Sequence, residues 1–240
     1  MLKEIRFGQG EILYITDQEE TYAALREEGR YVLPYYHERN RGAAFPGAIY
    51  AVECLEEVEE ASLEMAYRRL AGLPWEILQT ERCIIRETTV EDVDSFYRLY
   101  GEPSITEYME PLFGDRDEEI AYTKNYIEKV YGFYGYGMWT VLEKNSKEVI
   151  GRAGISWREG YELPELGFVI GVPWQRQGYA FEVCTAILAY AKTELLMGQV
   201  QALVQPGNKI SLNLCEKLGF TLGGETELDG EKHLLLVKKL

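Results

Sequence analysis

The sequence has few of the side chains that build metal sites and disulfide scaffolds. Its 240 residues include four cysteines and two histidines. The cysteines form no C-x-x-C pair and stand far apart, at Cys54, Cys83, Cys184 and Cys215. This spacing predicts neither a zinc framework nor a disulfide scaffold, and it is typical of a protein from a reducing cytosol. We therefore expect no bound metal.

Long hydrophobic runs are also missing. No apolar stretch approaches the roughly 18 residues that a membrane-spanning helix needs. The N-terminal segment MLKEIRFGQG contains no apolar signal sequence. The sequence therefore predicts a soluble, cytoplasmic protein without a membrane partner.

Positive charge is scarce: the sequence has 25 Lys and Arg residues and 40 Asp and Glu residues, which gives a formal net charge of −15. This excess disfavours a nucleic-acid partner held by phosphate neutralisation and permits a cationic partner. The window 168–217 differs, because its four basic and three acidic residues give a net charge of +1. A local anion site therefore remains compatible with the composition.

The hydrophobic content of 46% is ample for one large or two modest domains. In the first part, short apolar runs predict three strands, at 12–16, 31–36 and 49–53. Helices are expected after Asp17 and over 55–72. Because strands that alternate with helices form parallel sheets, residues 1–80 are predicted to be a small Rossmann-like αβ domain.

The stretch 73–81 contains Pro74 and several polar residues, which indicates a linker. Beyond it, strands are expected at 83–87, 137–144, 148–157, 165–171, 200–205 and 232–239. Helices are expected near 90–101, 115–132, 178–196 and 208–218. Residues 81–240 are therefore predicted to form a second domain of the α/β (α+β) class.

One loop in this second domain has the features of an anion site. The residues between strand 165–171 and the next helix are Gln175, Arg176, Gln177, Gly178, Tyr179 and Ala180. Backbone N–H groups at a helix start have no intrahelical partner, and the helix dipole adds positive potential, so the loop suits a diphosphate. The small Gly178 and Ala180 let a ligand approach the backbone. The alternative is a plain turn after a strand.

These residues resemble the acetyl-CoA loop Q/R-x-x-G-x-G/A of the GNAT superfamily of N-acetyltransferases. Downstream, Asn208, Ser211 and the run KLGF at 217–220 match the family's later N-x-x-S…KLGF segment. The resemblance spans about 83–240, and the run ELG…PWQ…GYA…E at 165–182 looks like the subgroup that contains ribosomal-protein N-terminal alanine acetyltransferases. It implies a GNAT fold with a mixed central sheet.

The resemblance also implies a cofactor, acetyl-CoA, and a reaction, transfer of the acetyl group to a primary amine of a protein N-terminus or a small molecule. The diphosphate would lie on the backbone of residues 177–180. The pantetheine arm would follow Phe168, Val169 and Ile170. Asn208 would reach the pantetheine or acetyl end, and Ser211 the neighbouring phosphate or pantetheine region. The alternative is a non-catalytic acyl-CoA-binding sensor with the same fold.

Two residues are candidates for the proton transfers. Glu165 begins the central strand and is a candidate general base; the alternative is a surface carboxylate at a strand end. Many members of the family have a tyrosine acid seven residues after the asparagine, and this sequence has Cys215 there. That cysteine is a candidate acid or, alternatively, a small core residue, with solvent protonating the thiolate.

The aromatic segment 131–139 offers a wall for the amine-binding cleft, through Tyr134, Tyr136 and Trp139. The alternative is core packing around glycine-rich turns. His37 and His233 have no partner in the sequence pattern, so both are expected to be structural.

The first 80 residues weakly resemble the last part of a haloacid-dehalogenase-type hydrolase, with Asp17 in the acidic position. The nucleophilic D-x-D of that family is missing, because Asp92 and Asp94 fall where a helix is expected. This argues against phosphohydrolase activity. We expect an accessory domain for docking, dimerisation or substrate recognition, in a monomer or a homodimer.

Overall fold

The computed structural model describes residues 1–8 and 10–240, which form two compact units, Met1–Trp75 and Glu76–Leu240. Each unit has its own hydrophobic core. The division lies inside the predicted linker. The strand β4 (Glu76–Gln79) pairs with the second unit, so part of that linker is an edge strand.

The first unit contains a three-stranded sheet in the order β1-β2-β3. Its elements are β1 (Leu2–Phe7), β2 (Glu11–Thr16), α1 (Glu19–Glu27), β3 (Tyr31–Pro34), η1 (Glu38–Asn40) and α2 (Glu60–Leu70). The strands β2 and β3 are parallel and joined by α1, as predicted, whereas β1 is antiparallel to β2. The predicted third strand at 49–53 is wrong, since only one bridge forms there, between Tyr35 and Val52.

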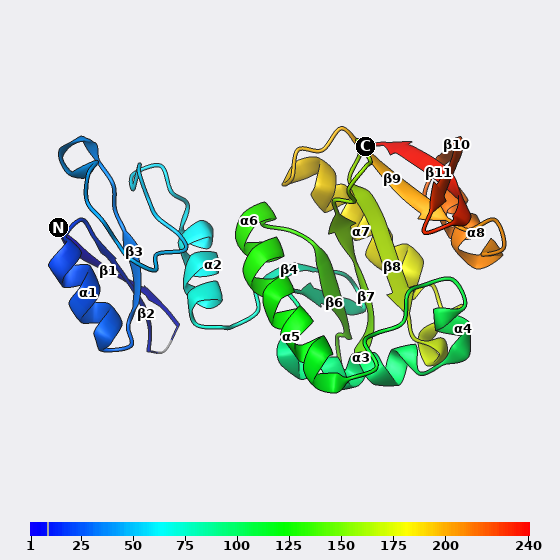
Figure 1. The fold of residues 1–240 in the computed structure, drawn as a ribbon, viewed down its shortest axis with the longest axis horizontal. Coiled ribbons are helices and arrows are strands. Elements are labelled where there is room, and N and C mark those ends of the chain that lie inside the picture. Colours follow the sequence, from blue (N-terminus) through cyan, green and yellow to red (C-terminus); the bar gives the residue numbers. More distant parts are fainter. Residues whose placement is uncertain (9) are drawn as a thin grey trace. The chain divides into compact units, whose positions relative to one another are not determined.

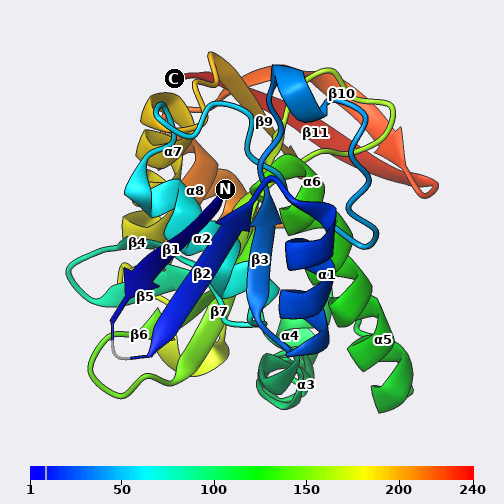
Figure 2. The same ribbon diagram turned by 90° about the vertical axis from the view of Figure 1, so that its left-hand side faces the viewer.

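The two helices of this unit cover opposite faces of its sheet (Figures 1 and 2). Leu13 and Ile15 of β2 belong to the core cluster that contains Tyr67 of α2. On the other face, Val32 of β3 clusters with Tyr22 of α1. The alternation of side chains along each strand supplies both faces with apolar residues.

Asp17 follows β2 and joins three segments of the first unit. Its carboxylate accepts from the terminal ammonium of Met1 and lies 3.0 Å from His37 Nε2. The hydrogen bond from the ammonium, with that from His37, holds the pKa of Asp17 below its ordinary value. Asp17 thus has contacts that stabilise the fold of this unit.

The second unit contains an eight-stranded mixed sheet in the order β10-β11-β9-β8-β7-β6-β5-β4. Its further strands are β5 (Cys83–Arg86), β6 (Met138–Glu143), β7 (Val149–Ser156), β8 (Glu165–Ile170), β9 (Gln199–Val204), β10 (Thr221–Leu228) and β11 (Glu231–Lys239). All neighbours are antiparallel except β8 and β9. The mixed sheet agrees with the predicted fold, and β10 is an addition.

Helices lie on both sides of this sheet, with α5 in front and α7 behind in the view of Figure 1. The main helices are α3 (Val93–Tyr100), α5 (Arg116–Tyr126), α7 (Tyr179–Thr193) and α8 (Lys209–Lys217). Shorter turns are η2 (Val90–Asp92), α4 (Pro103–Thr106), the π-helix η3 (Ile127–Tyr131), α6 (Gly132–Tyr134) and η4 (Val172–Trp174). Among the helices of residues 1–8 and 10–240, none combines the length and apolar character required to cross a membrane.

The parallel strands β8 and β9 separate soon after they meet. They pair at a single position, Glu165 with Gln201. On its other edge β8 is paired with β7 from Glu165 to Ile170. The remainder of β8 therefore presents an open backbone edge toward β9, which is a place where an extended ligand can bind.

Candidate active site

The predicted anion loop precedes α7 and adopts a left-handed conformation at two residues. Gly178 has φ +87° and Arg176 has φ +60°. Within the described chain, none of the backbone N–H groups of residues 176–180 donates a hydrogen bond. Five free donors at the start of a 15-residue helix form a cradle that fits a diphosphate.

The two glutamines of this loop hold the loop itself. Gln175 Nε2 donates to the Ile170 carbonyl at 2.9 Å, and Gln177 Nε2 donates to the Pro173 carbonyl at 2.7 Å. These contacts leave the backbone N–H groups free for a ligand. The glutamine side chains therefore position the loop. The groups left to bind a ligand are the backbone N–H groups of the loop.

Arg82, just before β5, braces the same loop from a distant part of the sequence. Its guanidinium donates to the Gln177 carbonyl at 3.0 Å and lies 4.2 Å from the ring centre of Tyr179. Glu182 of α7 accepts from Arg82 Nε at 2.7 Å and from its backbone N–H at 2.8 Å. Because 95 residues separate Arg82 from Gln177, no local pattern predicted this contact.

A cavity of about 740 Å³ adjoins the loop. Gly178, Tyr179 and Ala180 line one side, and Ile210 and Leu214 of α8 line another. The charged residues of its lining are Arg176 and Lys217, with no carboxylate among them. The cofactor cavity, as we name this space, is therefore locally positive in an acidic protein, as the charge of window 168–217 indicates.

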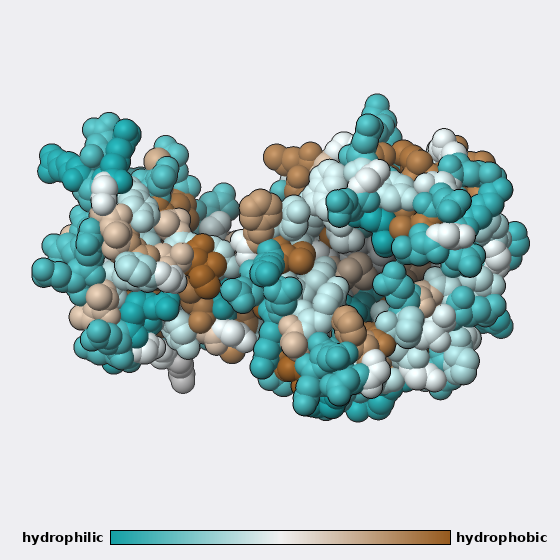
Figure 3. All heavy atoms as spheres, viewed as in Figure 1, coloured by the Kyte–Doolittle hydropathy of each residue, from teal (hydrophilic) through white to brown (hydrophobic). Residues whose placement is uncertain are grey.

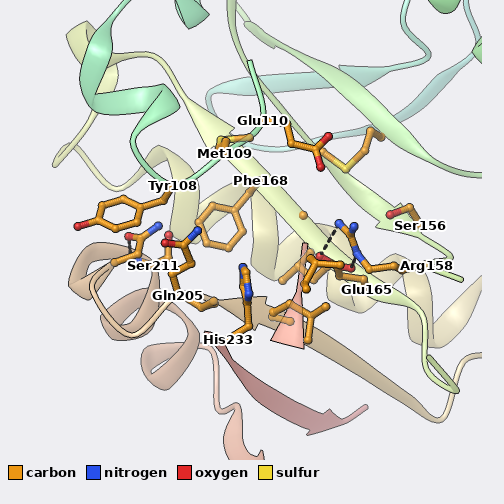
Figure 4. A pocket seen from close by; sticks show the side chains of 18 of the residues that line it. Tyr108, Met109, Glu110, Ser156, Arg158, Glu165, Phe168, Gln205, Ser211 and His233 are labelled. Carbon is orange, nitrogen blue, oxygen red and sulfur yellow. Dashed lines mark hydrogen bonds and ion pairs between the residues drawn. The ribbon is translucent and has the colours of Figure 1, made fainter. Parts of the chain in front are cut away.

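A second cavity, of about 530 Å³, is lined by residues of β7, β8, β9 and β11. Phe168, Asn208 and Ser211 line it. Asn208 Oδ1 accepts from the backbone N–H of Ser211 at 3.1 Å and so caps α8, which leaves its amide NH₂ free of any hydrogen bond in the described structure. We name this space the acceptor cavity (Figure 4).

Glu165 lies in the acceptor cavity and is only 9% exposed. Arg158 Nε donates to Glu165 Oε2 at 2.6 Å, as Figure 4 shows. The hydrogen bond to Glu165 raises the pKa of Arg158 above its ordinary value. Glu165 is thus an oriented, buried carboxylate rather than a surface residue at a strand end.

His233 also lines this cavity, although the sequence pattern indicated a structural residue. It is 8% exposed and its Nδ1 lies 3.0 Å from the Glu231 carbonyl. A carbonyl only accepts, so Nδ1 carries the hydrogen and Nε2 of the neutral ring has a free lone pair. No pattern in the sequence indicates that the His233 side chain, in strand β11, faces a cavity.

Cys215 lies in the core and lines neither cavity. It is fully buried in the main hydrophobic cluster, and this burial raises the pKa of its thiol to about 11. A thiol without access to the acceptor cavity cannot protonate a leaving group there. The predicted acid role of Cys215 is therefore wrong, and the alternative of a small core residue holds.

The predicted aromatic wall is also corrected. Trp139 is completely buried and packs edge-on against Tyr190, with ring centres 5.8 Å apart, so it cannot contact a substrate. Tyr134 and Tyr136 lie outside the acceptor cavity, and the Tyr136 hydroxyl accepts from Trp157. Four other tyrosines line the cavity instead: Tyr100, Tyr108, Tyr122 and Tyr126.

The free N–H cradle, the open edge of β8 and the two cavities together offer donors and space that would fit an extended, diphosphate-containing ligand. Comparison with known proteins makes the class specific. A family model described as an acetyltransferase (GNAT) domain matches residues 82–221, and the chain belongs to this family of acetyltransferases.

Two relatives and one solved structure show how far the similarity extends. The Bacillus subtilis protein YkkB is 31% identical over 147 residues, which cover 59% of this chain and 83% of YkkB. The ribosomal protein uS5-alanine N-acetyltransferase of Escherichia coli is 27% identical over 162 residues, covering 64% and 82%. A putative GNAT-family acetyltransferase from Bordetella pertussis has a TM-score of 0.58 at 24% identity, covering 67% and 98%. The family model begins at residue 82, so the first unit lies outside the matched range.

Proposed function

We propose that the protein transfers an acetyl group from acetyl-CoA directly to a primary amine. The observation that carries this proposal is the set of five free backbone N–H groups at residues 176–180, which adjoins a cavity whose charged lining residues are the cations Arg176 and Lys217. Membership of the acetyltransferase family supports the reaction class. Acetyl-CoA, when bound, supplies an acetyl group activated as a thioester.

The residues around the loop would hold the cofactor along its whole length. The N–H cradle takes the diphosphate, and the open edge of β8 at Phe168 offers backbone groups to the pantetheine arm. The backbone of Val169 is paired with Arg152 of β7, so its predicted contact with the arm is not available. The Ile170 carbonyl already accepts from Gln175, so it is the position least available to the ligand. The free amide of Asn208 extends this row of polar groups into the acceptor cavity.

Amine attack requires that the ammonium group of the acceptor lose a proton first. We assign this proton to Glu165, directly or through water, because its carboxylate is buried in the acceptor cavity and oriented by Arg158. His233 Nε2 is a second buried candidate base in the described cavity lining. Since Cys215 has no access, the leaving thiolate takes its proton from solvent.

Glu165→Gln should reduce kcat by about 10²-fold while the affinity for CoA stays unchanged, because the amide keeps the shape and loses the base. Steady-state thiol release across pH 6–10 measures this. The matched control is Glu162→Gln, which removes the same charge from an exposed residue three positions away. An unchanged kcat and pH profile in Glu165→Gln, with both altered in His233→Asn, would move the role to His233.

The acceptor is proposed to be a protein N-terminus or a small amine. The similarity to a relative named for acetylating ribosomal protein uS5 favours the first, and the volume of the acceptor cavity, about 530 Å³, accommodates the second. Mass spectrometry of peptides with free N-termini and of small amines, each incubated with enzyme and acetyl-CoA, separates the two.

A further inference from the structure

Arg152 is a charged side chain inside the acceptor cavity without a charged partner. It lies on β7, and its guanidinium stacks on Phe96 of α3, 4.6 Å from the ring centre. Its Nε is buried and has no hydrogen-bond partner. Among the described residues no carboxylate forms an ion pair with it, although the side chain lines the cavity.

The other charges of this cavity are either paired or at its rim. Glu165 and Arg158 satisfy each other. The remaining carboxylates of the lining are exposed to solvent: Glu107, Glu110, Asp229 and Glu231. In Figure 3 the hollow on this face of the second unit is bordered largely by hydrophilic residues. The unbalanced charge of the interior is therefore the cation of Arg152.

A guanidinium in this position keeps its charge. Burial opposes the charged form, but the neighbouring phenols of Tyr100, Tyr131 and Tyr126 outweigh it and raise the pKa of Arg152 above its ordinary value. A buried charge without a counter-charge is costly, and a planar guanidinium matches a carboxylate or a phosphate through paired N–H groups. Tyr100 shares a side-chain hydrogen bond with Arg152, and a bound oxyanion would add the counter-charge that the interior of the cavity lacks.

We propose that Arg152 binds an acidic group of the acceptor, so that the substrate is an amine that also carries a carboxylate or a phosphate. This inference rests on the proposed acetyl transfer. The rim carboxylates favour entry of the ammonium end, and the interior guanidinium receives the oxyanion. The enzyme therefore recognises both the ammonium group and the acidic group of the acceptor.

The register of the sheet gives the separation of the two ends. Ser156 is opposite Glu165, and Arg152 is opposite Val169, on the same face of the sheet. Four residues along β7 separate these positions by roughly 13 Å. Between them the glycines 154 and 167 are paired, and the side chain of Met138 lines the cavity there. This arrangement fits an elongated acceptor, such as a short peptide, with an apolar middle.

The test uses pairs of amines that differ only in the acidic group. Short peptides with a free C-terminal carboxylate are compared with their C-terminal amides, and phosphorylated amino alcohols are compared with the unphosphorylated amines. The wild-type enzyme should favour the acidic member by about 10- to 100-fold in kcat/KM, the range expected for a charge-assisted pair. The pair with the larger ratio identifies whether the oxyanion is a carboxylate or a phosphate.

Arg152→Gln should bring this ratio close to one, mainly through a loss of kcat/KM for the acidic member of each pair. Arg152→Lys, which keeps the charge without the planar fork, should retain part of the preference. The matched control is Arg98→Gln on the exposed side of α3, which should keep the wild-type ratio. A wild-type ratio near one, or a ratio unchanged in Arg152→Gln, would overturn the proposal.

A binding measurement separates this inference from the proposed reaction. Calorimetric titration of the CoA-saturated protein with each amine pair reports preference without turnover. Preferential binding of the acidic members, lost in Arg152→Gln, supports the oxyanion site even if no amine is acetylated. Acetylation of neutral amines with equal binding of both members would contradict the oxyanion site and leave the acetyl transfer intact.

Discussion

Cys215 occupies the family's acid position but is enclosed by the core, and this has a measurable consequence. Cys215→Ala should leave kcat within about threefold and lower the stability by about 1–2 kcal/mol, since a small buried group is removed. The ordinary thiol pKa is near 9 and burial raises that of Cys215 to about 11. The stabilisation from the neutral thiol is therefore complete below pH 9 and is lost as pH rises toward 11.

Thermal unfolding from pH 7 to 10.5 measures this prediction. The difference in melting temperature between wild type and Cys215→Ala should shrink above pH 9. If the alanine variant kept its fold but turned over about 10²-fold more slowly, the thiol would be restored as a participant in the chemistry.

At the residue scale, motif positions were predictable and cavity-facing strand residues were not. Gly178 and Asn208 occur in fixed local patterns, a strand-to-helix turn and a helix cap, so their surroundings follow from the sequence. The setting of Arg152 and His233 depends on which strands pair and which face is covered by a helix. The prediction that Trp139 lines the cleft is wrong for the same reason. The alternation of side chains along a strand does not show which face of the sheet is covered by helices and which is open.

At the element scale, the loop before α7 depends on a residue from the start of β5. Arg82→Gln should weaken CoA binding by about tenfold, because the contacts that hold the Gln177 carbonyl and the Tyr179 ring in place are lost. Turnover at saturating cofactor should stay within about threefold of the wild-type rate. Calorimetric titration with CoA measures the affinity.

The control for this prediction is Lys192→Gln, which removes a charge from an exposed position of the same helix. Gly178→Glu should abolish binding, since it places a carboxylate on the cradle and a side chain at φ +87°. Equal losses in Arg82→Gln and Lys192→Gln would show that net charge, rather than loop position, controls the affinity.

Element boundaries that rest on strong periodicity agree with the structure, and weakly patterned strands do not. The predicted helix 208–218 corresponds to α8, and the predicted strands 137–144 and 148–157 form the hairpin β6–β7. The sequence does not predict the strands β1 and β10, because more than half of the residues in each are exposed and neither has a buried apolar stripe along its length. The segment 49–53 has the apolar pattern of a strand but forms a single bridge, between Val52 and Tyr35. Strand formation depends on packing against neighbouring strands as well as on the local pattern.

At the scale of the whole molecule, the two units have separate cores, so the second should fold alone. A fragment of residues 76–240 is expected to unfold cooperatively and to bind CoA with the affinity of the full chain. A fragment of residues 81–240 lacks β4, exposes the edge of β5 and should melt at a lower temperature. Circular dichroism melts of both fragments measure this; equal melting temperatures would show that β4 adds nothing to the second unit.

The charge of the molecule is divided in a way that the net value conceals. The protein carries −15 overall, yet the charged residues in the described lining of the cofactor cavity are both cations, and its main donors are neutral backbone N–H groups. The carboxylates of the acceptor cavity lie mainly at its rim. A protein of acidic composition can therefore bind both a polyanionic cofactor and an amine acceptor.

The central claim, acetyl transfer from acetyl-CoA to a primary amine, is tested most directly by quantifying both products in one reaction. The wild-type protein is incubated with acetyl-CoA and a panel of amines, and free thiol and acetylated amine are measured together. The account predicts equal amounts of the two for at least one amine, and neither product with Gly178→Glu. Tight binding of acetyl-CoA without thiol release for any amine would contradict it and indicate a cofactor sensor.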